Sequence, residues 1–93
     1  MVEVASIDAN QIEAMSAMLR GIVQALVDDP EAVSVSVITQ GGESALRVQV
    51  AVSDLGKVVG KQGRTARSLR TILAAASMKL HHRFALEILE LPK

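Results

Sequence analysis

Apolar residues in the first third of the chain recur at the three- and four-residue spacing of a helix. They predict an amphipathic helix over about residues 11–28. Asn10 and Glu13 resemble a capping box at its start, with Asn in place of the usual Ser or Thr. Helical angles are disfavoured before proline, so we expect the helix to stop at Asp29 and Pro30. The apolar face consists of Ile12, Met15, Leu19, Ile22 and Leu26.

Three later segments alternate apolar and polar residues, which is typical of half-buried strands. The first strand contains Val33, Val35 and Val37, and the hairpin signal Gly41-Gly42 leads into a returning strand. The inward positions of the returning strand are Leu46, Val48, Val50 and Val52. The inward positions of a third strand, near the end of the chain, are His82, Phe84, Leu86 and Ile88.

Two helices are expected between the second and third strands. Ser53 can cap a short helix over residues 54–59, and Gly60 can end it in the left-handed conformation. A longer helix follows over residues 63–80, with a core stripe formed by Ala66, Leu69, Leu73, Ala76 and Leu80. The order α-β-β-α-α-β predicts an α+β domain with a three-stranded sheet and helices on one face. We treat residues 1–10 as a lead-in and residues 11–91 as a single domain.

Composition limits the class of protein. The 93 residues suffice for one domain with a modest core, and 49% of them are apolar. Cysteine is absent, which fits a reducing compartment. The first residues lack the pattern of a signal peptide, and no apolar run approaches the roughly 18 residues of a membrane span. We therefore expect a cytoplasmic protein.

Charge is concentrated in one third of a neutral chain. Between Asp54 and Arg83 there are seven basic residues and a single acid, so this segment carries +6 and the remainder −6. Such a segment favours a polyanionic partner, although charge alone is equally consistent with a solvated helix surface. The basic residues are Lys57, Lys61, Arg64, Arg67, Arg70, Lys79 and Arg83.

A glycine loop lies inside this basic segment. Gly60 and Gly63 bracket Lys61 and Gln62, and two glycines allow the backbone to turn sharply and approach a bulky partner. The loop leads into a helix N-terminus, where free N–H groups and the helix dipole favour an anion. With basic neighbours, the expected anion is a sugar-phosphate backbone. The alternative is a bare turn in which Gly60 caps one helix and Gly63 opens the next.

Residues 53–73, which include this Gly-x-x-Gly (GxxG) loop over residues 60–63, resemble the signature of the small bacterial KH proteins of the KhpA (YlqC-type) family. The resemblance extends over about residues 11–91. The loop lies about sixty residues from the N-terminus, which is similar to the type II, prokaryotic form of the KH domain. KH domains clamp about four nucleotides of a single strand on this loop.

The resemblance implies a site. Gly60 and Gly63 would hold the nucleic-acid backbone, Lys61 would contact a phosphate and Gln62 would point outward. The flanking cations Lys57, Arg64 and Arg67 would widen the positive track. Val59, with Val50 or Val52, would form the floor of the groove beneath unpaired bases. Phe84, the only aromatic residue, belongs to a strand's apolar stripe, so base stacking is not expected and specificity should be weak.

The resemblance also implies a role. Members are RNA-binding proteins, expected to act as RNA chaperones or post-transcriptional regulators that influence cell-wall growth and cell length. They pair with themselves or with a larger KH protein of the KhpB type. The alternative from another class is a protein-interaction adaptor whose KH groove is vestigial.

Catalytic, metal and cofactor sites are not expected. No Ser/His/Asp arrangement or carboxylate pair supports an enzyme. A phosphate-binding P-loop pattern fails, because Leu55 stands where its first glycine should be and Gln62 follows the lysine. Adjacent His81 and His82 project in different directions without further ligands, so a helix-end role is favoured over a metal site.

One flank of the long helix suggests self-association. Ile72 lies about 80° from the centre of the core stripe, and its neighbours Ser68 and Ala75 are small. With the stem of Lys79, these residues form a candidate dimer interface. The alternative is that Ile72 widens the core stripe.

Overall fold

The computed structural model describes residues 8–90 and confirms the α+β class and the order α-β-β-α-α-β. Of the predicted lead-in over residues 1–10, residues 1–7 lie outside the described residues, as does the predicted domain end at Leu91, whereas α1 already begins at Ala9. The elements are α1 (Ala9–Leu26), η1 (Pro30–Ala32), β1 (Ser34–Gln40), β2 (Glu43–Val50), η2 (Val52–Asp54), α2 (Leu55–Val59), η3 (Lys61–Gly63), α3 (Arg64–Leu80) and β3 (Arg83–Glu90).

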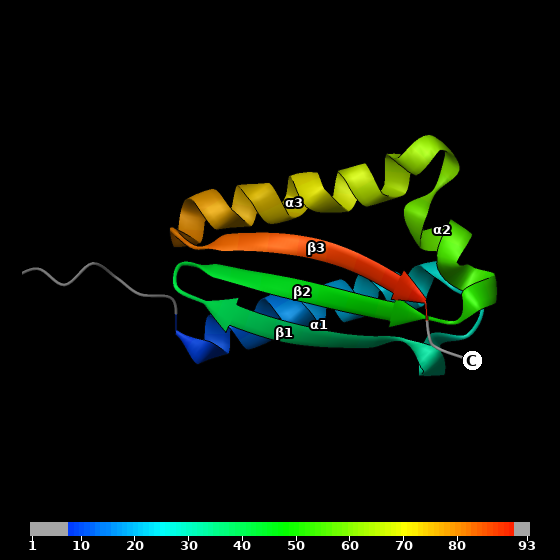
Figure 1. Ribbon diagram of the computed structural model, residues 1–93, viewed down its shortest axis with the longest axis horizontal. Helices are drawn as coiled ribbons and strands as arrows, with labels where there is room; N and C mark the ends of the chain where they lie inside the picture. Colours follow the sequence, from blue (N-terminus) through cyan, green and yellow to red (C-terminus); the bar gives the residue numbers. More distant parts are fainter. Residues whose placement is uncertain (1–7, 91–93) are drawn as a thin grey trace, which may run out of the picture.

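The sheet has the strand order β1-β2-β3 and is mixed. β1 and β2 form an antiparallel hairpin closed by Gly41, whose φ of 60° suits glycine. β2 and β3 are parallel, so the chain must cross from one end of the sheet to the other, and α2 and α3 make this crossover. In Figure 1, α1 lies behind β1 and β2, α3 runs alongside β3, and α2 stands at the end where β2 finishes. The turn between α2 and α3 therefore projects from one end of the domain.

The core lies between the sheet and the helices. In β2 the predicted inward positions are buried as far as Val50, and in β3 they are buried as far as Leu86. Phe84 is 6% exposed. The α3 stripe is confirmed, with Ala76 and Leu80 partly buried at its edge. The buried apolar residues that form one cluster are Met15, Leu19, Val23, Val33, Leu46, Val48, Val50, Val58, Leu69, Leu73, Phe84 and Leu86.

The start of α1 differs from the sequence prediction. Asp8, not Asn10, is the N-cap residue, and its Oδ1 accepts hydrogen bonds from the backbone N–H groups of Asn10 (2.6 Å) and Gln11 (3.2 Å). The Gln11 side chain accepts the Asp8 N–H at 3.1 Å, which completes a capping box. The predicted box of Asn10 and Glu13 is therefore wrong, because Asp8 and Gln11 supply the same chemistry two residues earlier.

Both α1 and β2 end two residues earlier than predicted. α1 ends at Leu26, where Val27 turns to extended angles, rather than at residue 28. β2 ends at Val50, so Val52 lies in η2 and is 44% exposed. Ser53 does not cap α2, because Asp54 occupies the N-cap position and its side chain makes no capping bond. Within residues 8–90, no helix has both the length and the apolar character needed to cross a membrane.

Candidate nucleic-acid interface

The GxxG loop is a tight turn between α2 and α3 that needs positive φ angles at three positions. Gly60 donates its N–H to the Gly56 carbonyl at 2.8 Å and has φ 81° and ψ 169°. Gln62 and Gly63 adopt the left-handed conformation, with φ of 57° and 75°. The prediction that Gly60 is left-handed is therefore wrong, because its ψ angle lies outside the left-handed region. The left-handed residues are Gln62 and Gly63 instead.

The two glycines of the loop are constrained in different ways. A Cβ on Gly60 would collide with Thr65 Oγ1 and lie 2.8 Å from the Thr65 backbone nitrogen. A Cβ on Gly63 would meet no heavy atom within 4 Å. Gly60 thus allows Thr65 to pack closely against the loop, whereas the Cβ position of Gly63 is open, although the Gly63 N–H already donates to the Gly60 carbonyl at 3.1 Å.

The basic side chains around the loop are exposed. Lys61, Arg64 and Arg67 are exposed, and none of the three forms an ion pair within the described part of the chain. Arg64 Nη2 donates to Gln62 Oε1 at 3.4 Å, so these two side chains lie together at the start of α3. Three free cations thus surround a helix N-terminus, where the dipole adds to the positive potential.

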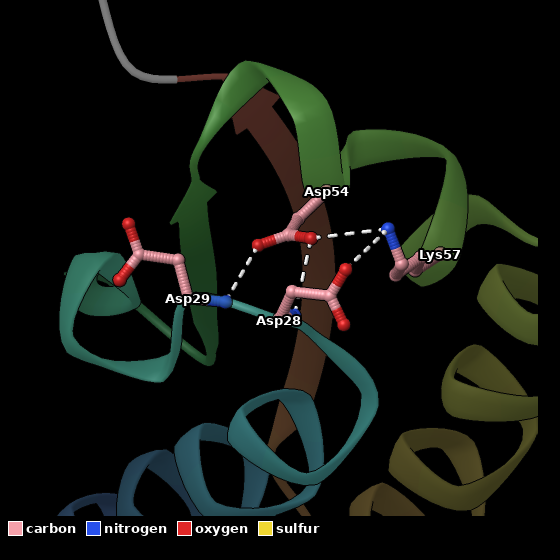
Figure 2. A network of polar contacts seen from close by, with 4 residues as sticks. All are labelled: Asp28, Asp29, Asp54 and Lys57. Carbon is pink, nitrogen blue, oxygen red and sulfur yellow. Dashed lines mark hydrogen bonds and ion pairs between the residues drawn. The ribbon is translucent and has the colours of Figure 1, made fainter.

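Lys57 differs from the other predicted cations because it is paired within the protein. Its Nζ lies 3.3 Å from Asp54 Oδ1 and 3.3 Å from Asp28 Oδ2 (Figure 2). The bond to Asp54, followed by that to Asp28, raises the pKa of Lys57. Its ammonium group is therefore held by two carboxylates beside the loop.

Asp54 is a buried acid that the sequence did not single out as functional. The residue is 1% exposed, and its two carboxylate oxygens accept the backbone N–H groups of Asp28 (3.1 Å) and Asp29 (3.0 Å). The bond from the Asp28 amide is the largest cause that holds the pKa of Asp54 below its usual value; burial opposes it, and the Asp29 amide and Lys57 reinforce it. The feature of the sequence that could have drawn attention to Asp54 is that it is the one acid in the basic segment.

The proposed floor of the groove is only partly available. Val50 is fully buried, so the prediction that it could lie under a base is wrong. Val52 is exposed but belongs to η2 rather than to the sheet, and Val59 is half-buried at the end of α2. Arg70, which the predicted site omitted, is exposed, and its Nη2 donates to the Leu86 carbonyl of β3 at 3.5 Å.

The flank of α3 that was considered as a dimer interface is exposed. Ile72 is 45% exposed, so it does not belong to the core stripe, and Ser68 and Ala75 beside it are also exposed. Met78, one turn further along α3, is 79% exposed. Dimerisation through this flank stays a prediction.

The two histidines have structural surroundings. His81 is the left-handed C-cap residue of α3. His82 is 5% exposed, with Nε2 at 2.7 Å from Ser44 Oγ and its ring edge-on to Phe84. Among residues 8–90, no three His, Cys, Asp or Glu side chains gather as a metal site would require.

Comparison with known proteins shows close relatives of this chain. The family model described as "KhpA/KhpB, KH domain" matches residues 16–88. The RNA-binding protein KhpA of Clostridium acetobutylicum is 43% identical over 75 residues, which cover 81% of this chain and 100% of the relative. The protein of the same name from Borreliella burgdorferi is 40% identical over 81 residues, and these cover 87% of this chain and 94% of that one.

A solved structure with a similar fold is more distant in sequence. Era in complex with MgGDPNP and nucleotides 1506–1542 of 16S ribosomal RNA superimposes with a TM-score of 0.56 at 15% identity. The match covers 85% of this chain but only 31% of the Era chain. At this identity the likeness concerns the fold alone. The helix and strand order, with parallel β2 and β3, is that of a type II KH domain.

Proposed function

This chain belongs to the KhpA/KhpB family of KH domains, and from that premise we propose that it is a non-catalytic RNA-binding protein that holds single-stranded RNA beside its GxxG loop. The observation that carries the proposal is the arrangement of Lys61, Arg64 and Arg67. These side chains are exposed at the N-terminus of α3, and none of them pairs with an acid among residues 8–90. Such cations neutralise phosphates and release counterions, which supplies most of non-specific nucleic-acid affinity.

The two faces of the loop suggest how a sugar-phosphate chain is held. Thr65 packs against Gly60, while no atom of residues 8–90 outside the immediate chain neighbours lies over the Cβ position of Gly63. A phosphate can therefore approach the backbone closely at Gly63, with Lys61 and Gln62 exposed beside it. Arg64 and Arg67 continue the positive track along α3.

Base recognition is expected to be weak. Phe84 is the only Phe, Tyr or Trp of the chain and is buried, so none of these rings is available for stacking. Val59, directly before the loop, offers a small apolar contact, and the exposed Val52 offers another before α2. Arg70, between α3 and the edge of β3, is a further cation within reach of a strand bound along α3. We expect a preference for single strands rather than for a particular sequence.

The proposal extends to partners and physiology through family membership. Ile72, Ser68 and Ala75 are the proposed contact between two copies, or between this chain and a larger KhpB-type protein. An RNA chaperone or post-transcriptional role in the cytoplasm, linked to cell-wall growth and cell length, is the physiology that we propose. These roles rest on the family resemblance.

A salt titration of a labelled single-stranded RNA tests the proposed function. If Lys61, Arg64 and Arg67 each neutralise one phosphate, the logarithm of affinity should fall against the logarithm of salt with a slope of about −2, at ~0.7 per contact. A flat response, or no binding at low salt, would contradict the proposal and favour a protein-interaction adaptor with a vestigial groove.

A further inference from the structure

The most deeply buried acid among residues 8–90 lies at the start of the short helix that leads into the loop. Asp54 ends η2 and sits at the N-cap position of α2, six residues before Gly60. Its two oxygens accept successive backbone N–H groups from Asp28 and Asp29, in the connection that follows α1. Figure 2 shows the carboxylate directed into this connection, with Lys57 reaching from α2 toward both Asp54 and Asp28. We call these four residues the Asp54 clamp.

The clamp matters because α2 cannot hold its own position. The helix has five residues, well below the length at which an isolated helix is stable. Val58 is its one fully buried side chain, and Leu55 packs against the core only partly buried, so apolar contacts alone hold α2 weakly. The Asp54 clamp adds a polar anchor at the N-terminal end of α2. Gly60 begins where α2 ends, so the orientation of α2 sets the start of the GxxG loop.

We propose that Asp54 is a positioning residue for the GxxG loop: its carboxylate ties α2 to the connection after α1, and Lys57 serves as its counter-ion rather than as a phosphate contact. The inference rests on the proposed function, because it concerns the geometry of the same site. It assigns Lys57 differently from the free cations Lys61, Arg64 and Arg67. A phosphate at Lys57 would be repelled by two carboxylates that already lie 3.3 Å from its ammonium group.

The first test replaces Asp54→Asn, which keeps the shape of the side chain but removes its charge and one of its two acceptor oxygens. When the binding-competent orientation is only fractionally populated, the affinity is multiplied by that fraction, so a loop that is competent ~10–20% of the time binds RNA roughly fivefold to tenfold more weakly. Affinity is measured at a temperature where melting curves show the variant fully folded. The NMR amide signals of Lys61 and Gly63 are expected to shift.

The matched control is Ser44→Ala. Ser44 is also fully buried and bonded, to Thr39 and His82, but it pairs with Phe84 near the start of β3, whereas Val50 and α2 lie at the opposite end of the sheet. A purely structural role for Asp54 predicts that both variants melt earlier and that neither changes RNA affinity while folded. The clamp predicts that only the Asp54 variant binds RNA more weakly. If Asp54→Asn does not fold, Asp54→Glu replaces it, since the extra methylene displaces the carboxylate from the two amides.

The second test concerns Lys57. Replacing Lys61→Gln should reduce the salt slope of RNA binding by ~0.7, whereas Lys57→Gln should leave that slope unchanged while lowering affinity as Asp54→Asn does. Equal loss of slope in the two variants would overturn the assignment of Lys57, and native affinity in folded Asp54→Asn or Asp54→Glu would overturn the positioning role. Failure of the unmodified protein to bind RNA would instead contradict the proposed function.

Discussion

Gly60 and Thr65 lie so close that no side chain fits between them: a Cβ on Gly60 would stand 2.8 Å from the Thr65 backbone nitrogen and would collide with its hydroxyl oxygen. This contact folds the GxxG loop back onto the first turn of α3. It also separates the roles of the two glycines, because Gly63 has open space on the corresponding side. The motif therefore combines one glycine required by packing within the protein and one that leaves its backbone accessible.

The two glycines should respond differently to alanine. Gly60→Ala is expected to cost about 2–3 kcal/mol of unfolding free energy, because its angles belong to a region that only glycine populates and the new Cβ meets Thr65. Gly63→Ala should cost about 1–2 kcal/mol, the strain of a left-handed residue alone. Urea unfolding of both variants measures the difference. An equal loss at the two positions would contradict the packing role of Gly60.

The Asp54 carboxylate should make stability depend on pH in the acid range. The pKa of Asp54 is lowered in the folded protein, chiefly by the Asp28 amide, so its contribution is complete above the usual value of 3.8 and is lost as the pH falls through the folded value. The difference in unfolding free energy between the native protein and Asp54→Asn should be constant near neutral pH and shrink below pH 3.8. Unfolding at a series of pH values checks this. If this difference in unfolding free energy stays the same down to strongly acid pH, the result would contradict an ionised Asp54 in the clamp.

Self-association should depend on Ile72. Ile72 is 45% exposed, and its neighbours Ser68 and Ala75 are small and exposed. A second α3 helix would therefore be able to approach closely. A two-fold pairing would place two loops on one assembly, so binding to long RNA would gain from effective concentration. Ile72→Tyr should give a folded monomer that binds long RNA more weakly and short RNA unchanged. Light scattering that finds the native protein monomeric at tens of micromolar would refute this interface.

The sequence predicted the fold because burial follows a simple period in most elements. The α3 stripe through Leu69 and Leu73 and the alternation through Leu46 and Val48 each place one face in the core. The exact caps were less predictable. Asp8 and Asn10 are both good capping residues, and in the folded helix Asp8 accepts the Asn10 and Gln11 N–H groups while the Gln11 side chain accepts the Asp8 N–H.

The loop could be predicted from the sequence but its support could not. Gly60 and Gly63 are visible as a motif within the basic segment. The partners of Asp54, in contrast, lie 25 and 26 residues earlier in the chain, and no local pattern connects them. For the same reason Lys57 was counted with the free cations, although two acids brought together by the fold hold it.

RNA binding by a loop variant tests the central claim most directly. Replacing Lys61→Asp and Gln62→Asp together reverses the charge at the proposed phosphate contact. The new carboxylates lie near the N-terminus of α3, where acids interact favourably with the helix dipole by ~0.3–1 kcal/mol each, so the fold should be retained. The control places the same change in net charge on exposed positions of α1, through Ala17→Asp and Arg20→Asp.

The measurement is the affinity of each protein for one single-stranded RNA at low salt, with a thermal melt on the same preparation. The account predicts that the loop variant melts normally and no longer binds, while the α1 control binds with no more than the small loss that its added charge causes. Unchanged affinity in a loop variant that melts normally would contradict the account and leave residues 60–63 as a turn between two helices.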